Sequence, residues 1–167
     1  MTEPVSTQSV VEGDVVYQLV KDKTKVPGKD YLIVDVRGED HVGGHVTGSL
    51  NLPLHELPER LPELLEEHAD VPQLYFYCGQ SHFRGPQGAA VWAEGQSEEL
   101  AAKQQVYVLK GGFVKWQKKY KEDHELVENY DERHWKEWEA NSTNYCTMTI
   151  TNPIKLGSDG SMNGLTR

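Results

Sequence analysis

A cysteine and an arginine lie six positions apart in the segment Cys78-Gly-Gln-Ser-His-Phe-Arg84. The cysteine directly follows the apolar run Leu74-Tyr-Phe-Tyr77, which is short, aromatic and typical of a buried strand. The arginine is followed by Gly85-Pro86, and proline is well suited to the first turn of a helix. The sequence therefore predicts a strand, a tight loop and a helix, with Cys78 at the mouth of the loop.

These residue types indicate transfer chemistry on phosphate or a phosphate-like oxyanion. Loop N–H groups and a helix N-terminus that point at one place form an anion site. A thiol held there is pushed toward the thiolate, which is the nucleophilic form. The guanidinium of Arg84 can bind two oxygens of a tetrahedral oxyanion side by side. We expect Cys78 and Arg84 to be catalytic and the oxyanion to be bound by Gly79, Gln80, Ser81, His82, Phe83 and Arg84.

The elements that must position this loop alternate between strands and helices. Strands are predicted at residues 31–36, 49–52, 74–77 and 106–109, and helices at residues 10–20, 54–65, 86–103, 113–120 and around Trp135 and Trp138. Pro58 and Pro62 are expected to break the second helix into two segments. This alternation predicts a parallel sheet covered on both faces, with the loop at the carboxyl end of a central strand.

The chain has 167 residues, which suits one domain with a sizeable core. We expect a catalytic domain at residues 9–139, a flexible leader at residues 1–8 and a polar, poorly ordered tail at residues 140–167. Neither a secretory signal nor a membrane span is expected, so the predicted location is the cytoplasm and also the nucleus. The net charge of −9 argues against nucleic acid and anionic membranes as partners. The predicted ligand is an oxyanion or a phosphorylated substrate, attracted locally by the loop.

Three further motifs accompany the loop. They are Tyr31-Leu-Ile-Val-Asp35-Val-Arg37, Gly43-Gly-His45-Val-Thr-Gly-Ser-Leu-Asn51 and Gly111-Gly-Phe-Val-Lys-Trp116. Together with the loop they resemble the rhodanese superfamily over residues 9–138. The resemblance implies a rhodanese-like α/β domain with a central, mainly parallel five-stranded sheet and helices on both faces. The seven residues from Cys78 to Arg84 resemble the branch that contains the Cdc twenty-five phosphatases and the fungal arsenate reductases.

This resemblance implies a cysteine-dependent phosphatase that acts on phosphate monoesters, including phosphotyrosine, through a phosphocysteine. One alternative is an arsenate reductase that uses the same thiolate, with glutathione and glutaredoxin as external reductants. Another alternative is a catalytically weak rhodanese-like binding module. The branch usually has histidine before the cysteine, where this chain has Tyr77, and that departure favours the module. No tightly bound cofactor and no metal are expected.

Other residues have two interpretations each. Glu39 and Asp40, after the first motif, are the candidates for a general acid. Asp35 and Arg37 could be catalytic, but the family favours a structural ion pair below the loop. Ser81 could contact the sulfur or only close the turn.

His41 and His45 lie four residues apart and could be taken for a metal pair, but no further ligand completes a site. We expect His45 to be structural. Cys146 could serve as a resolving thiol, although it lies in the predicted tail.

Overall fold

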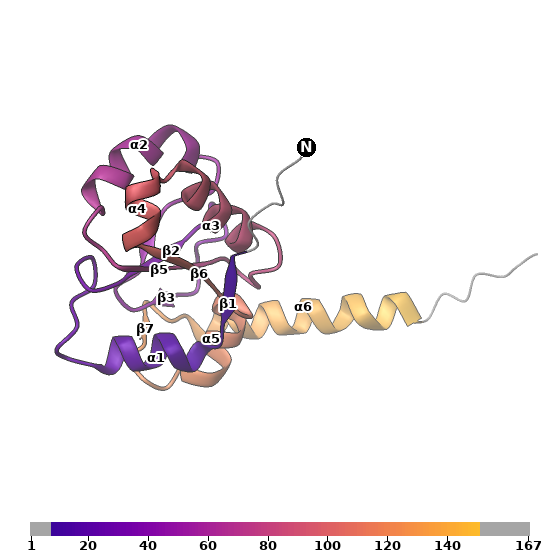
Figure 1. Cartoon of the computed structure of the whole chain (residues 1–167). Coiled ribbons are helices and arrows are strands. Elements are labelled where there is room, and N and C mark those ends of the chain that lie inside the picture. Colours follow the sequence, from indigo (N-terminus) through magenta and orange to yellow (C-terminus); the bar gives the residue numbers. More distant parts are fainter. Residues whose placement is uncertain (1–7, 151–167) are drawn as a thin grey trace, which may run out of the picture. The chain divides into compact units, whose positions relative to one another are not determined.

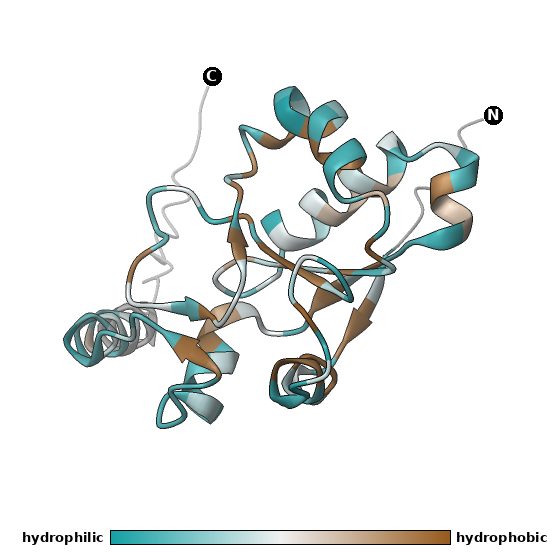
Figure 2. Ribbon diagram, turned by 90° about the vertical axis from the view of Figure 1, so that its left-hand side faces the viewer, coloured by the Kyte–Doolittle hydropathy of each residue, from teal (hydrophilic) through white to brown (hydrophobic). Residues whose placement is uncertain are grey.

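The computed structural model describes residues 8–150, with the side chains of residues 8–142, and its central sheet has five strands. They are β1 (Ser9–Val11), β2 (Leu32–Asp35), β4 (Leu50–Asn51), β5 (Gln73–Tyr77) and β6 (Gln105–Leu109). Their order is β1-β6-β5-β2-β4, and every neighbouring pair is parallel. The predicted five-stranded parallel sheet is thus confirmed, with β5 at its centre. The sheet strands carry hydrophobic residues because both faces are covered (Figure 2).

Helices cover both faces of the sheet (Figure 1). One face carries α2 (Leu57–Glu67), α3 (Arg84–Gly95) and α4 (Glu98–Lys103), and the other carries α1 (Gly13–Lys21) and α5 (Gly112–Tyr120). A separate antiparallel pair joins β3 (His45–Val46) to β7 (Val127–Glu128). Among the described residues, no helix is long and apolar enough to cross a bilayer.

The alternation of side chains along β5 decides which face each site residue occupies. Phe76 and Cys78 belong to the core cluster below α3, which also contains Trp92. Tyr75 and Tyr77 belong to the other face, where the Tyr77 ring lies 6.4 Å from the ring of Phe113 in α5. Successive residues of a strand point to opposite faces, so Cys78 and the tyrosine that precedes it lie on different sides of the sheet.

Two predicted helices differ from the structure. The predicted helix at residues 86–103 is two helices, α3 and α4, because the chain is extended at Gln96 and Ser97. The Ser97 hydroxyl accepts a hydrogen bond from the Leu100 N–H and starts α4 as an N-cap. The predicted break of α2 at its prolines is wrong, since the helix runs through Pro62. Its buried leucines pack into the core, and this packing compensates for the missing N–H.

The two ends of the chain also differ from the sequence expectation. Residues 10 and 11, predicted to begin a helix, belong to β1 instead, because three residues are too few to show a strand period. The chain divides into two units between Asp131 and Glu132, and the second unit contains α6 (Glu132–Ile150). This helix continues past residue 140, where the sequence predicts the start of a polar, poorly ordered tail. The rest of the predicted tail, residues 151–167, and residues 1–7 of the predicted leader lie outside the described residues.

Candidate active site

Cys78 is the first residue after β5 and is buried, with 4% of its surface exposed. The helix α3 begins at Arg84, two residues earlier than Pro86 suggested. Between them Ser81 adopts a left-handed conformation with φ of 55°, which turns the loop back toward the helix. The predicted strand, loop and helix are therefore present, and Cys78 and Arg84 are the two ends of one loop.

Ser81 and Gly85 shape the inside of the loop. The Ser81 hydroxyl accepts a hydrogen bond from the Cys78 N–H at 3.4 Å. This bond closes the turn through the backbone, as in the structural interpretation of Ser81. A Cβ at Gly85 would lie 3.1 Å from the Ser81 oxygen and 3.4 Å from the Cys78 nitrogen. Glycine at position 85 therefore lets α3 begin directly against the loop.

The first turn of α5 supports the loop from outside. The Phe113 N–H donates to the Cys78 carbonyl and the Val114 N–H to the Gly79 carbonyl, both at 2.9 Å. N–H groups in the first turn of a helix have no acceptor within it, so the loop carbonyls satisfy them. Gly112, at φ of 56°, makes this approach possible, because a Cβ there would lie 2.4 Å from the Cys78 oxygen. The Gly-Gly-Phe motif thus anchors the loop between Cys78 and Arg84.

This anchoring also orients the loop amides. In a planar trans peptide the C=O and the following N–H point in opposite directions. Because the carbonyls of Cys78 and Gly79 point at α5, the N–H groups of Gly79 and Gln80 point away from it. Neither N–H donates to another described residue, so both are available to a bound oxyanion.

Arg84 binds Asp40 through two hydrogen bonds. Its Nη1 donates to Oδ1 at 2.7 Å and its Nη2 to Oδ2 at 2.5 Å. The hydrogen bond from Arg84 holds the pKa of the Asp40 carboxyl below its ordinary value. The same bond raises the pKa of Arg84, and an electrostatic contribution from the nearby Cys78 adds to this effect. Asp40 is therefore an anion here, which is not the protonated form that a general acid needs, while the other candidate, Glu39, is exposed.

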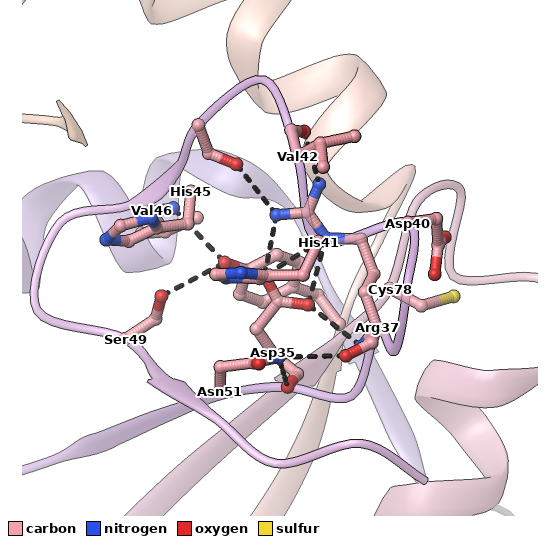
Figure 3. A network of polar contacts seen from close by, with 12 residues as sticks. Asp35, Arg37, Asp40, His41, Val42, His45, Val46, Ser49, Asn51 and Cys78 are labelled. Carbon is pink, nitrogen blue, oxygen red and sulfur yellow. Dashed lines mark hydrogen bonds and ion pairs between the residues drawn. The ribbon is translucent and has the colours of Figure 1, made fainter. Parts of the chain in front are cut away.

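Asp35 and Arg37 form a second, buried pair (Figure 3). The Arg37 Nη2 donates to Asp35 Oδ2 at 2.7 Å and to the Gly44 carbonyl at 2.8 Å. The Asn51 amide donates to the carbonyls of Asp35 and Arg37. These bonds close the loop between β2 and β3, and this loop carries Asp40. The geometry supports the structural interpretation of the buried pair.

His41 and His45 stack on one another, with ring centroids 5.4 Å apart. The His45 Nε2 bonds Glu128 Oε2 at 2.8 Å, and the His41 Nε2 lies 3.4 Å from Asp35 Oδ2. Burial lowers the pKa of His41, which favours its neutral form at pH 7. Across residues 8–142, no group of three potential ligands could hold a metal ion.

Tyr77 is fully buried on the opposite face of the sheet from Cys78. Its hydroxyl accepts a hydrogen bond from the Val46 N–H and shares another with the Ser49 hydroxyl, both at 3.1 Å. Burial raises its pKa well above the ordinary value, so the hydroxyl stays protonated. Tyr77 thus ties β5 to β3, a role that sequence reasoning missed because it compared this position only with the histidine of the family.

The rim of the loop is exposed and partly apolar. Gln80 and His82 are exposed, and Phe83 is 82% exposed. Val42 is 47% exposed in the facing loop that carries Asp40. The structure therefore places the predicted oxyanion-loop residues together, with their outer side chains toward solvent.

Comparisons with known proteins agree with this geometry. The family model for the rhodanese-like domain matches residues 15–119, which include the loop. CDC25-like phosphatase YCH1 of Saccharomyces cerevisiae is 33% identical over 110 residues, covering 60% of this chain and 74% of that protein. Arsenical-resistance protein 2 of the same yeast is 31% identical over 98 residues, covering 53% and 75%. The structure of Ygr203w, described as a yeast protein tyrosine phosphatase of the rhodanese family, matches with a TM-score of 0.69 at 26% identity, covering 78% of this chain and 98% of that one.

Proposed function

Because the chain belongs to the family of rhodanese-like domains, we propose that it is a cysteine-dependent phosphatase of phosphate monoesters, with phosphotyrosine as the biological ester. One observation carries the proposal: at the loop of Cys78, Arg84 already binds a two-oxygen anion, the Asp40 carboxylate. Two parallel N–H donors suit two oxygens of a phosphoryl group in the same way. The similarity to YCH1 supports this reaction class.

The proposed reaction has two steps. The Cys78 thiolate attacks phosphorus in line, the sulfur–phosphorus bond forms, and the bond to the ester oxygen breaks with its electron pair on that oxygen. Arg84 and the N–H groups of Gly79 and Gln80 hold the equatorial oxygens, where charge is spread in the transition state. The leaving oxygen takes a proton from a general acid or from water, and Glu39 remains a candidate. Water then cleaves the phosphocysteine, which releases phosphate and restores the thiolate.

A second candidate is arsenate reduction, which the similarity to arsenical-resistance protein 2 favours. The same thiolate would attack arsenate at the same anion site. External thiols, glutathione with glutaredoxin, would then supply two electrons and end as a disulfide while arsenic(V) becomes arsenic(III). In both reactions the reductant or water comes from outside, and no tightly bound cofactor takes part.

A side-by-side assay of the purified protein tests these candidates. One arm measures phosphate release from p-nitrophenyl phosphate, and the other measures arsenite formation with glutathione and glutaredoxin. Cys78→Ser is the control, since serine is nearly isosteric but is not ionised at neutral pH. We expect turnover of the ester that disappears in the variant. Arsenite formation without ester turnover would refute the phosphatase proposal in favour of arsenate reduction. No turnover in either arm would favour a binding module.

A further inference from the structure

Arg84 binds an internal carboxylate with the same two donors that the proposed reaction needs for a phosphoryl group. Both terminal nitrogens of its guanidinium donate to Asp40, one to each carboxylate oxygen. A carboxylate and two oxygens of a tetrahedral anion make the same kind of two-point contact with this fork. The two anions therefore compete for the same donors.

The exposure of this pair distinguishes it from the other arginine–carboxylate pair of the site. The side chains of Arg84 and Asp40 are 40% and 49% exposed. Those of Arg37 and Asp35 are 2% and 0% exposed and have further hydrogen bonds to the backbone. An exposed ion pair contributes little net stability, whereas breaking a buried pair leaves an uncompensated charge. Arg84 can therefore exchange its partner, and Arg37 cannot.

The charge balance of the site gives the exchange a direction. With Asp40 in place, the cation of Arg84 is neutralised, and the Cys78 thiolate that the proposed reaction requires adds a negative charge. A phosphate dianion arriving at this site would be repelled, in a chain that already carries a net charge of −9. Movement of Asp40 away from Arg84 exposes the cation to the incoming anion.

We propose that Asp40 is an internal competitor that occupies Arg84 until an oxyanion substrate displaces it. This inference rests on the oxyanion site of the proposed function but not on hydrolysis. It makes the loop between β2 and β3, which Arg37 closes through the Gly44 carbonyl, the part of the protein that sets oxyanion affinity.

The test measures oxyanion binding without turnover, as protection of Cys78 from iodoacetamide by inorganic phosphate. All proteins carry Cys146→Ser so that one thiol is followed. Asp40→Asn removes the charge but keeps a side-chain oxygen. That oxygen can still accept the hydrogen bond that the Gly38 N–H donates to Asp40 Oδ1 at 3.2 Å. Glu59→Gln is the control, because it removes one negative charge from an exposed position of α2 outside the site.

We expect Asp40→Asn to lower the phosphate concentration that gives half-maximal protection about threefold to fivefold. This range matches the small free energy that an exposed ion pair contributes. Glu59→Gln should leave this concentration nearly unchanged. If Asp40→Asn binds phosphate equally well or more weakly, the proposal is overturned. Asp40 would then either have no effect on phosphate binding or help to bind it by positioning Arg84. Protection in none of the proteins would overturn both this inference and the proposed function. If phosphate protects Cys78 with the expected shift but the protein does not hydrolyse the ester, the proposed phosphatase activity is refuted, while the role of Asp40 as an internal competitor stands.

Discussion

Gly112→Ala should separate the active loop from α5. The new Cβ would lie 2.4 Å from the Cys78 carbonyl oxygen and 2.5 Å from the Gly79 oxygen, in a backbone with φ of 56°. Both oxygens belong to the backbone and cannot move aside cheaply, so the helix start and the loop must part. The hydrogen bonds from the N–H groups of Phe113 and Val114 are then lost.

The expected cost follows from these contacts. A left-handed conformation costs a residue with a Cβ about 1 to 2 kcal/mol, and two backbone hydrogen bonds contribute about 1 kcal/mol each. We therefore expect the free energy of unfolding to fall by about 3 to 4 kcal/mol, measured by urea denaturation. Displacement of the loop by about 1 Å should also reduce kcat/KM for an aryl phosphate about 100-fold.

Gly28→Ala is the matched control for this prediction. Gly28 also has a positive φ, of 81°, but a Cβ there would meet nothing within 4 Å. This variant isolates the backbone strain, so it should lose about 1 to 2 kcal/mol and keep full activity. If Gly112→Ala is no less stable than Gly28→Ala, α5 does not anchor the loop and the reasoning fails.

Three further predictions concern the loop and its neighbours. Arg84→Lys should lower kcat/KM about 100-fold, because a lysine has no planar fork, and a loss below about threefold would exclude Arg84 as the oxyanion clamp. Tyr77→Phe leaves the buried Val46 N–H without its acceptor and should lower the free energy of unfolding by about 1 to 3 kcal/mol. The rate at which Cys78 is alkylated should hardly change in that variant, and a large change would show that Tyr77 acts on the thiol. Arg84 lowers the pKa of Asp40 in the folded protein below 3.8, so the pair stabilises the fold above that pH and this stabilisation is lost as the pH falls through the lowered pKa. The free energies of unfolding of wild-type and Asp40→Asn protein, measured by urea denaturation, should therefore converge at acid pH. A difference that stays constant with pH would contradict the ion pair.

The local part of the site could be predicted because its signals are contiguous. Buried parallel strands carry nearly continuous apolar residues, so β2, β5 and β6 were predicted to within one residue at each end. Cys78 and Arg84 lie in one strand–loop–helix segment and were therefore placed together. The short strands β3 and β7 have two residues each and carry no period that a sequence can show.

The pairing of Arg84 with Asp40 could not be predicted in the same way. The two residues are 44 positions apart, and their contact depends on how β2 lies beside β5. The sequence identified both residues as part of the site but suggested a proton donor at Asp40. The structure instead shows an anion with its charge already compensated, and only the fold brings that partner to it.

Two arginine–carboxylate pairs of the same chemistry therefore have different roles in one site. Removing one partner of a buried pair such as Asp35–Arg37 costs about 3 to 5 kcal/mol, whereas an exposed pair contributes about 0 to 1 kcal/mol. A phosphoryl group that makes two hydrogen bonds to Arg84 can offset the small free-energy cost of opening an exposed pair but not the larger cost of breaking a buried one. The buried pair consequently holds the β2–β3 loop in place while the exposed pair opens, and the same loop can support the site and regulate access to Arg84.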